Sequence, residues 1–139
     1  MKLRNLTILL AAMFYSSFAL AEVAVIVNPG SSISSLSNND VKRIFLGKSK
    51  KLGGGKAAPI DSKEGSAARE VFYDKVVGKN AAQLKSYWST MIFSGKGTPP
   101  TEVGSDADVV SHVAKNAGAI GYVDASAVDG SVKTVMNVK

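Results

Sequence analysis

Residues 23–27 read VAVIV, an unbroken apolar run that ends at Asn28-Pro29-Gly30. A short run rich in β-branched residues and followed by turn residues is typical of a strand buried on both faces, as in α/β sheets. Apolar runs at residues 57–60 and 119–123 predict two more buried strands. Residues 132–138 alternate apolar and polar side chains, which predicts an edge strand. One face of that strand would carry Val132, Thr134, Met136 and Val138.

Four helices are expected between and beside these strands. Each begins at a polar capping residue, continues with apolar residues at helical spacing and ends at a glycine. They cover residues 37–47, 66–78, 80–95 and 105–118. In the third helix, one buried face is expected from Leu84, Tyr87, Trp88, Met91 and Ile92. The basic, glycine-rich segment Lys48–Lys56 is expected to be an exposed, mobile loop, and residues 96–104 a connector. The order of elements predicts an α/β domain with helices flanking a small mixed sheet.

The first 21 residues have the pattern of a secretory signal peptide. Lys2 and Arg4 form a basic start, an apolar stretch follows, and Ala19-Leu20-Ala21 is a small-residue cleavage site. The alternative is a membrane anchor, but the apolar stretch is short for a span and no stop-transfer pattern follows. The sequence therefore predicts a signal peptide at residues 1–21 and one periplasmic domain at residues 22–139.

Composition limits the kinds of function. The chain has 139 residues, no cysteine and a net charge of +6, which falls to +4 once Lys2 and Arg4 are removed. This weak positive charge favours anions slightly, and it is too small to indicate nucleic-acid binding. Without cysteine the fold has no disulfides, so its stability must come from the hydrophobic core.

The sequence offers little for catalysis or for metal binding. His112 is the only histidine, and no motif places it beside a nucleophile and an acid. Asp106 and Asp108 lack the further oxygen ligands of a calcium loop and are explained as acids in the first turn of a helix. Gly53-Gly54-Gly55-Lys56 lacks the first glycine and the final hydroxyl residue of a nucleotide-binding loop. We therefore expect no enzyme activity, no cofactor and no metal.

The stretch from Ser62 to Arg69, SKEGSAAR, is the best candidate for a binding site. A helix start presents unpaired backbone N–H groups and a partial positive charge, which together can hold an oxyanion. Gly65 allows close approach, the Ser66 hydroxyl and the Ala67 backbone add donors, and Arg69 and Lys63 add positive charge. The alternative is an ordinary helix cap, with Ser66 as the N-cap and Arg69 in solvent.

The chain resembles the substrate-binding proteins of phosphate ABC transporters, in the type II periplasmic binding-protein superfamily. The resemblance rests on VAVIVNP at 23–29, LS at 36–37 leading to IFLGK at 44–48, EGSxxRxxF at 64–72, and AIGYV at 119–123 followed by Val132-Lys133. In that family the loop commonly reads R-x-x-G-S-G-T-R and holds phosphate through backbone N–H groups, hydroxyls and the first Arg.

The resemblance implies a phosphate contact at Gly65, Ser66 and Arg69. Ser62 stands near the place of the family's first Arg, while Ala67 and Ala68 replace a Gly and a Thr. Family members have two lobes, and this chain has the length of one, so a homodimer could rebuild a cleft. The resemblance thus implies a periplasmic receptor for phosphate or a related oxyanion, with an ABC transporter permease or another periplasmic protein as partner. The alternative is a single-lobe accessory module that no longer binds a ligand and that uses Lys48–Lys56 as a contact surface.

Overall fold

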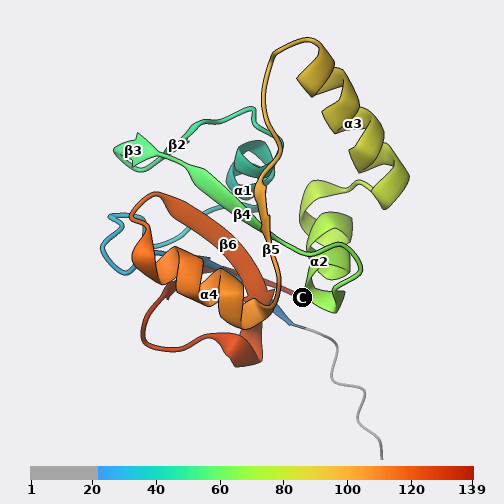
Figure 1. Cartoon of the computed structure of the whole chain (residues 1–139). Coiled ribbons are helices and arrows are strands. Elements are labelled where there is room, and N and C mark those ends of the chain that lie inside the picture. Colours follow the sequence, from blue (N-terminus) through green and yellow to red (C-terminus); the bar gives the residue numbers. More distant parts are fainter. Residues whose placement is uncertain (1–21) are drawn as a thin grey trace, which may run out of the picture.

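The computed structural model describes residues 22–139, which form a five-stranded mixed sheet with helices on both faces (Figure 1). The predicted signal peptide lies outside the described residues. The strands are β1 (Val23–Val27), β2 (Lys51–Leu52), β3 (Gly55–Lys56), β4 (Ala58–Ser62), β5 (Thr101–Val103), β6 (Ala119–Asp124) and β7 (Lys133–Val138). The helices are α1 (Asn38–Phe45), α2 (Ala67–Phe72), the π-helical η1 (Tyr73–Val77), α3 (Ala81–Phe93), α4 (Asp106–Lys115) and the 3-10 turn η2 (Ala125–Ala127). The predicted α/β fold class is confirmed.

The strand order is β5-β4-β6-β1-β7. β1 is antiparallel to β6 and β7, whereas β4 is parallel to β5 and β6. All five side chains of β1 are buried, as the sequence predicted. Val23, Val25 and Val27 pack on the side of α1, α2 and α3, and Ala24 and Ile26 on the side of α4. β1 is therefore the centre of two hydrophobic cores, one on each face of the sheet.

The larger core contains an aromatic cluster. The rings of Phe72 and Tyr122 stack with centroids 4.0 Å apart, and Phe45 meets Phe72 edge-on at 4.7 Å. On the other face α4 lies very close to β6, because a Cβ on Gly121 would come within 2.7 Å of Val109 Cγ1. These contacts fix α2 and α4 against opposite faces of the sheet.

The edge strand β7 was predicted correctly, but the division of its side chains was wrong. Val25 pairs with Met136 and Ile26 with Thr134, so Val135 is an extra residue opposite this pair. Such a bulge breaks the alternation of a strand. Val135 and Val138 consequently pack in the core on the α1 side, and Val132 packs on the α4 side.

Two segments that were expected to be irregular contain strands. Lys51–Lys56 is a β-hairpin that turns at Gly53-Gly54, with Gly53 at a φ of +60° and Leu52 buried, so the prediction of a loop there was wrong. Residues 101–103 form β5, which pairs Asp61 with Glu102 and Ser62 with Val103. β5 carries too few apolar residues to show strand alternation, which is why the sequence did not reveal it.

The predicted third helix is present as α3, but only part of its expected face is buried. Leu84 and Trp88 are buried, whereas Ile92 is 56% exposed and Phe93 96% exposed. Figure 1 shows α3 standing beyond the sheet, which leaves the end of the helix without a packing partner. The prediction that Ile92 is buried was therefore wrong, because helical periodicity does not show how far the underlying core extends.

Candidate functional site

The six residues predicted for the anion site lie at the junction of β4 and α2. Ser62 ends β4 and is buried, Lys63 and Gly65 are exposed in the connection that follows, and Ala67 is exposed at the first position of α2. Gly65 has a φ of +88°, a conformation that favours glycine. The structure brings Ser62, Ser66 and Arg69 together: the Arg69 backbone N–H donates to Ser66 Oγ at 3.3 Å, and Arg69 Nη1 donates to the Ser62 carbonyl oxygen at 2.8 Å.

Ser66 is the N-cap of α2. Its hydroxyl oxygen accepts the bond from the Arg69 N–H, which is the capping role foreseen as the alternative to anion binding. Capping uses only a lone pair, so the Ser66 hydroxyl proton remains able to donate to another group. The two roles are therefore compatible.

The Arg69 guanidinium is held by the protein rather than extended into solvent. Nη1 lies 3.5 Å from Asp61 Oδ2 and 3.6 Å from Glu102 Oε2, and the guanidinium carbon lies 5.2 Å from the centre of the Tyr73 ring. The Arg69 side chain is only 17% exposed. The expectation of a solvated Arg69 under the capping alternative was therefore wrong.

A buried carboxylate organises this arrangement. Tyr73 Oη donates to Asp61 Oδ2 at 2.7 Å, and Tyr122 Oη donates to Asp61 Oδ1 at 2.5 Å. Tyr122 Oη in turn accepts from the Ser62 N–H at 3.1 Å. Tyr73 begins η1, so the change from α-helix to π-helix occurs at the residue that reaches Asp61. These contacts anchor the end of β4 and the start of α2 on each other.

Burial dominates the ionisation of this network. It raises the pKa of Asp61 above its ordinary value, even though Tyr122, Arg69 and Tyr73 act in the opposite sense. Burial also raises the pKa of Tyr73 and of Tyr122, and the negative charge of Asp61 raises both further. Both tyrosines therefore donate to Asp61 as neutral phenols. Sequence reasoning missed this network. A usable signal was the tyrosine hydroxyl of Tyr122 in an otherwise apolar strand, since a buried hydroxyl needs a partner.

Ser62 contributes a second buried polar group. Within residues 22–139, its hydroxyl oxygen is buried without a hydrogen-bond partner. Unsatisfied buried hydroxyls are uncommon in native proteins and call for an explanation, such as a bound water, ion or ligand.

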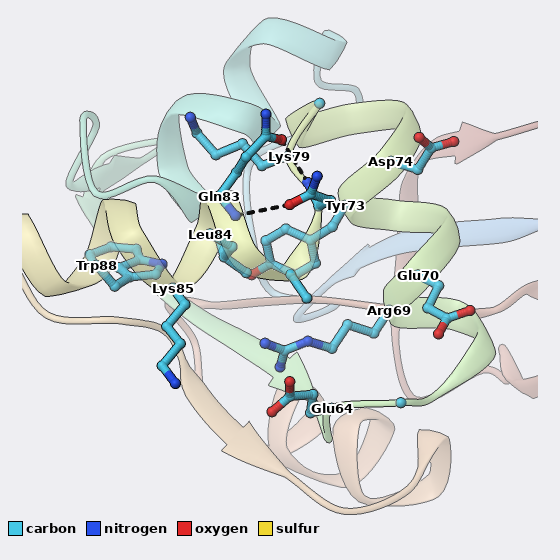
Figure 2. Close-up of a pocket in the computed structure, with 14 residues that line it drawn as sticks. Glu64, Arg69, Glu70, Tyr73, Asp74, Lys79, Gln83, Leu84, Lys85 and Trp88 are labelled. Atoms are coloured by element: carbon cyan, nitrogen blue, oxygen red, sulfur yellow. Dashed lines mark hydrogen bonds between the residues drawn. The ribbon is translucent and has the colours of Figure 1, made fainter.

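An open cavity of about 910 Å³ lies between α2 with η1 on one side and α3 on the other. Figure 2 shows the Arg69 guanidinium directed between the Tyr73 ring and Glu64, with Lys85 and Trp88 of α3 across the cavity. Glu70 and Asp74 point away from Arg69 in the same view. The cavity thus presents one held guanidinium, apolar and aromatic surface, and charges of both signs.

The residues weighed for catalysis and metal binding in the sequence lie on α4 and outside this cavity. His112 is exposed on α4 and is not among the cavity residues. Asp106 and Asp108 lie in the first turn of α4, as foreseen. Asp108 also completes the cap, because Ser105 Oγ accepts from its N–H and its carboxylate accepts from the Ser105 N–H. The described residues contain no group of three His, Cys, Asp or Glu side chains arranged to hold a metal ion. In the same residues, none of the helices has the length and apolarity needed to cross a membrane.

Comparisons with known proteins agree with this fold. One match is a structure from Clostridium perfringens, solved with bound phosphate and described as a phosphate ABC transporter substrate-binding protein. It matches with a TM-score of 0.68 and 24% identity, over 83% of this chain and 45% of its own. An ABC-type phosphate transport receptor from Vibrio cholerae matches with a TM-score of 0.68 and 20% identity over 84% of this chain and 46% of its own. The chain thus spans less than half the length of these structures, about one lobe. No curated protein matches it significantly. The PBP superfamily domain matches residues 11–137, and the chain therefore belongs to the PBP superfamily.

Proposed function

We propose that this chain is a periplasmic, non-catalytic binding protein for phosphate or a related oxyanion, exported through the signal peptide at residues 1–21. The anion is held by Ser66, by the Gly65–Ala67 backbone and by Arg69, with Ser62 and Lys63 beside it. Two proteins that share its fold, those of Clostridium perfringens and Vibrio cholerae, are described as phosphate receptors.

The observation that carries the proposal is the position of the Arg69 guanidinium. All three of its polar contacts, to Ser62, Asp61 and Glu102, are made by Nη1. Nε and Nη2 take no part in these contacts, and a planar guanidinium uses such a pair to bind an oxyanion in a bidentate manner. Nη1 donates to the Ser62 carbonyl oxygen, so the charge of Arg69 lies beside Ser62, the residue that stands near the place of the family's first Arg in the sequence.

One lobe leaves the anion partly hydrated, and this weakens each hydrogen bond that the protein makes to it. The carboxylates of Glu64 and Glu102 next to Arg69 weaken binding further. We therefore expect affinity in the micromolar to millimolar range. Delivery of the anion to an ABC transporter permease is part of this proposal.

A second candidate function is a single-lobe interaction module. The observation that favours it is the exposed pair Ile92 and Phe93 at the end of α3, since large apolar side chains gathered at an exposed helix end are typical of contact surfaces. The partner in this case is another periplasmic protein or a second copy of the chain. Sedimentation of the wild type and of Phe93→Ser would show whether a dimer exists and whether it depends on this pair.

Calorimetry on protein purified without phosphate tests the first proposal. Phosphate, sulfate and related anions are titrated into the wild type and into Arg69→Ala. Arg43→Ala is the matched control, because Arg43 is exposed on α1 and away from this cavity. We expect saturable heat that Arg69→Ala reduces by about tenfold or more in affinity and Arg43→Ala preserves. Flat titrations with every anion at millimolar concentration would remove the proposal.

A further inference from the structure

Glu102 occupies a distinctive position beside the candidate anion site. It is the middle residue of β5 and pairs with Asp61 in the parallel register of β4. This register directs its carboxylate to the same guanidinium that Asp61 contacts: Oε2 lies 3.6 Å from Arg69 Nη1. Its other oxygen, Oε1, accepts from the Glu64 backbone N–H at 3.4 Å. One side chain therefore contacts both kinds of donor that the proposed site offers to an anion.

A carboxylate is itself an oxyanion and is bound by the same donors as phosphate, namely backbone N–H groups and an Arg fork. We propose that the Glu102 carboxylate competes with the external anion for Arg69 and for the loop backbone, and so sets the affinity of the site. This inference rests on the proposed oxyanion-binding function.

The two acids around Arg69 are not equivalent. Asp61 is 5% exposed and each of its oxygens already accepts a tyrosine hydroxyl, so it cannot move aside. The Glu102 side chain is 53% exposed and its two contacts are long. Exposed pairs of this kind are weak, and an incoming anion can displace one at little cost. Asp61 consequently positions Arg69, while Glu102 regulates access to it.

The test compares Glu102→Gln with Glu70→Gln. Both variants remove one negative charge from the region of the cavity, but the Glu70 carboxylate points away from Arg69 (Figure 2). Calorimetry with inorganic phosphate should show about three- to tenfold tighter binding for Glu102→Gln, because both the competitor and its charge are lost. Glu70→Gln should change affinity by less than about twofold, since exposed charges away from the site are screened. Circular dichroism checks that both variants fold.

A second readout does not require phosphate. In protein free of anions, the NMR resonance of the Glu64 backbone N–H should shift in Glu102→Gln and stay in place in Glu70→Gln. An unmoved Glu64 resonance would overturn the inference by showing that the contact does not form. A shifted resonance together with unchanged or weaker phosphate binding would overturn it as well, while leaving the proposed function intact. A shifted resonance without phosphate binding in any of the three proteins would overturn the proposed function, and the inference with it.

Discussion

The starts of α2 and α4 share a serine cap but are completed in opposite ways. At α4, Ser105 Oγ accepts from the Asp108 N–H, and Asp108 Oδ2 accepts from the Ser105 N–H at 2.9 Å. At α2, Ser66 Oγ accepts from the Arg69 N–H, but the residue in the place of Asp108 is Arg69, whose side chain turns back to the Ser62 carbonyl. The fold thus neutralises the positive end of α4 with its own acid and adds a positive charge at α2.

This difference separates a structural helix start from one suited to a ligand. A carboxylate in the first turn offsets the helix dipole and completes the cap. A guanidinium there needs other support, and the buried Asp61–Tyr73–Tyr122 network provides it. The start of α2 therefore depends on the sheet for its stability, while α4 caps itself.

The largest effect is expected from Asp61→Ala. Removing the carboxylate leaves two buried tyrosine hydroxyls and Arg69 without their partner, so the free energy of unfolding should fall by about 3–5 kcal/mol. Urea denaturation measures this change. Asp74→Ala, at an exposed acid in η1, is the control and should have almost no effect. Equal losses for the two variants would contradict the support that α2 draws from Asp61.

A second experiment makes α2 resemble α4. Ala67→Asp places an acid at the first helical position, as Asp106 does in α4. Phosphate affinity should fall by about tenfold or more, because the new charge repels the anion. Thermal unfolding should show a gain of about 0.3–1 kcal/mol from the helix dipole. Ala67→Asn controls for side-chain size; an equal loss of affinity in that variant would show that charge is not the cause.

The third test removes each cap. Ser66→Ala and Ser105→Ala should each lower the free energy of unfolding by about 0.5–2 kcal/mol, measured by denaturation. Phosphate affinity should fall about two- to tenfold in Ser66→Ala alone, because only Ser66 belongs to the proposed site, whereas the Ser105 hydroxyl donates to Asp108 Oδ2 at 3.0 Å. If Ser105→Ala weakened phosphate binding as much, the two helix starts would not differ as described.

The smallest expected effect is on pH dependence. Burial raises the pKa of Asp61 in the folded chain above its ordinary value of 3.8, which applies in the unfolded chain. At a pH between the unfolded-state and folded-state pKa, Asp61 therefore holds a proton in the folded chain that it has lost in the unfolded chain. The contribution of Asp61 to the free energy of unfolding therefore falls as pH rises through this window. Asp61→Asn has no such ionisation, so the difference in free energy of unfolding between wild type and mutant, measured by denaturation, should change with pH across this window. A difference that stays flat with pH would contradict the raised pKa.

The sequence predicted the parts of the fold that have local signals. The buried run 23–27, the capped helices and their terminal glycines follow from side-chain periodicity and turn chemistry. The bulge at Val135 and the strand β5 depend on pairing between distant segments, which periodicity cannot show. The candidate anion site was also predicted from a local signal, the residues Gly65, Ser66 and Arg69 at a helix start. The two acids that contact Arg69, Asp61 and Glu102, were missed because they come from β4 and β5 and meet Arg69 only in the folded chain.

The most direct test of the central claim is an NMR titration of isotope-labelled protein with inorganic phosphate, in which each backbone N–H is followed separately. If phosphate binds at the start of α2, saturable shifts should centre on Gly65, Ser66, Ala67 and the Arg69 side chain, with the start of α4 at Ser105 unmoved. Shifts that cluster elsewhere, such as on the basic hairpin at Lys51–Lys56, or an absence of shifts at millimolar phosphate, would contradict it.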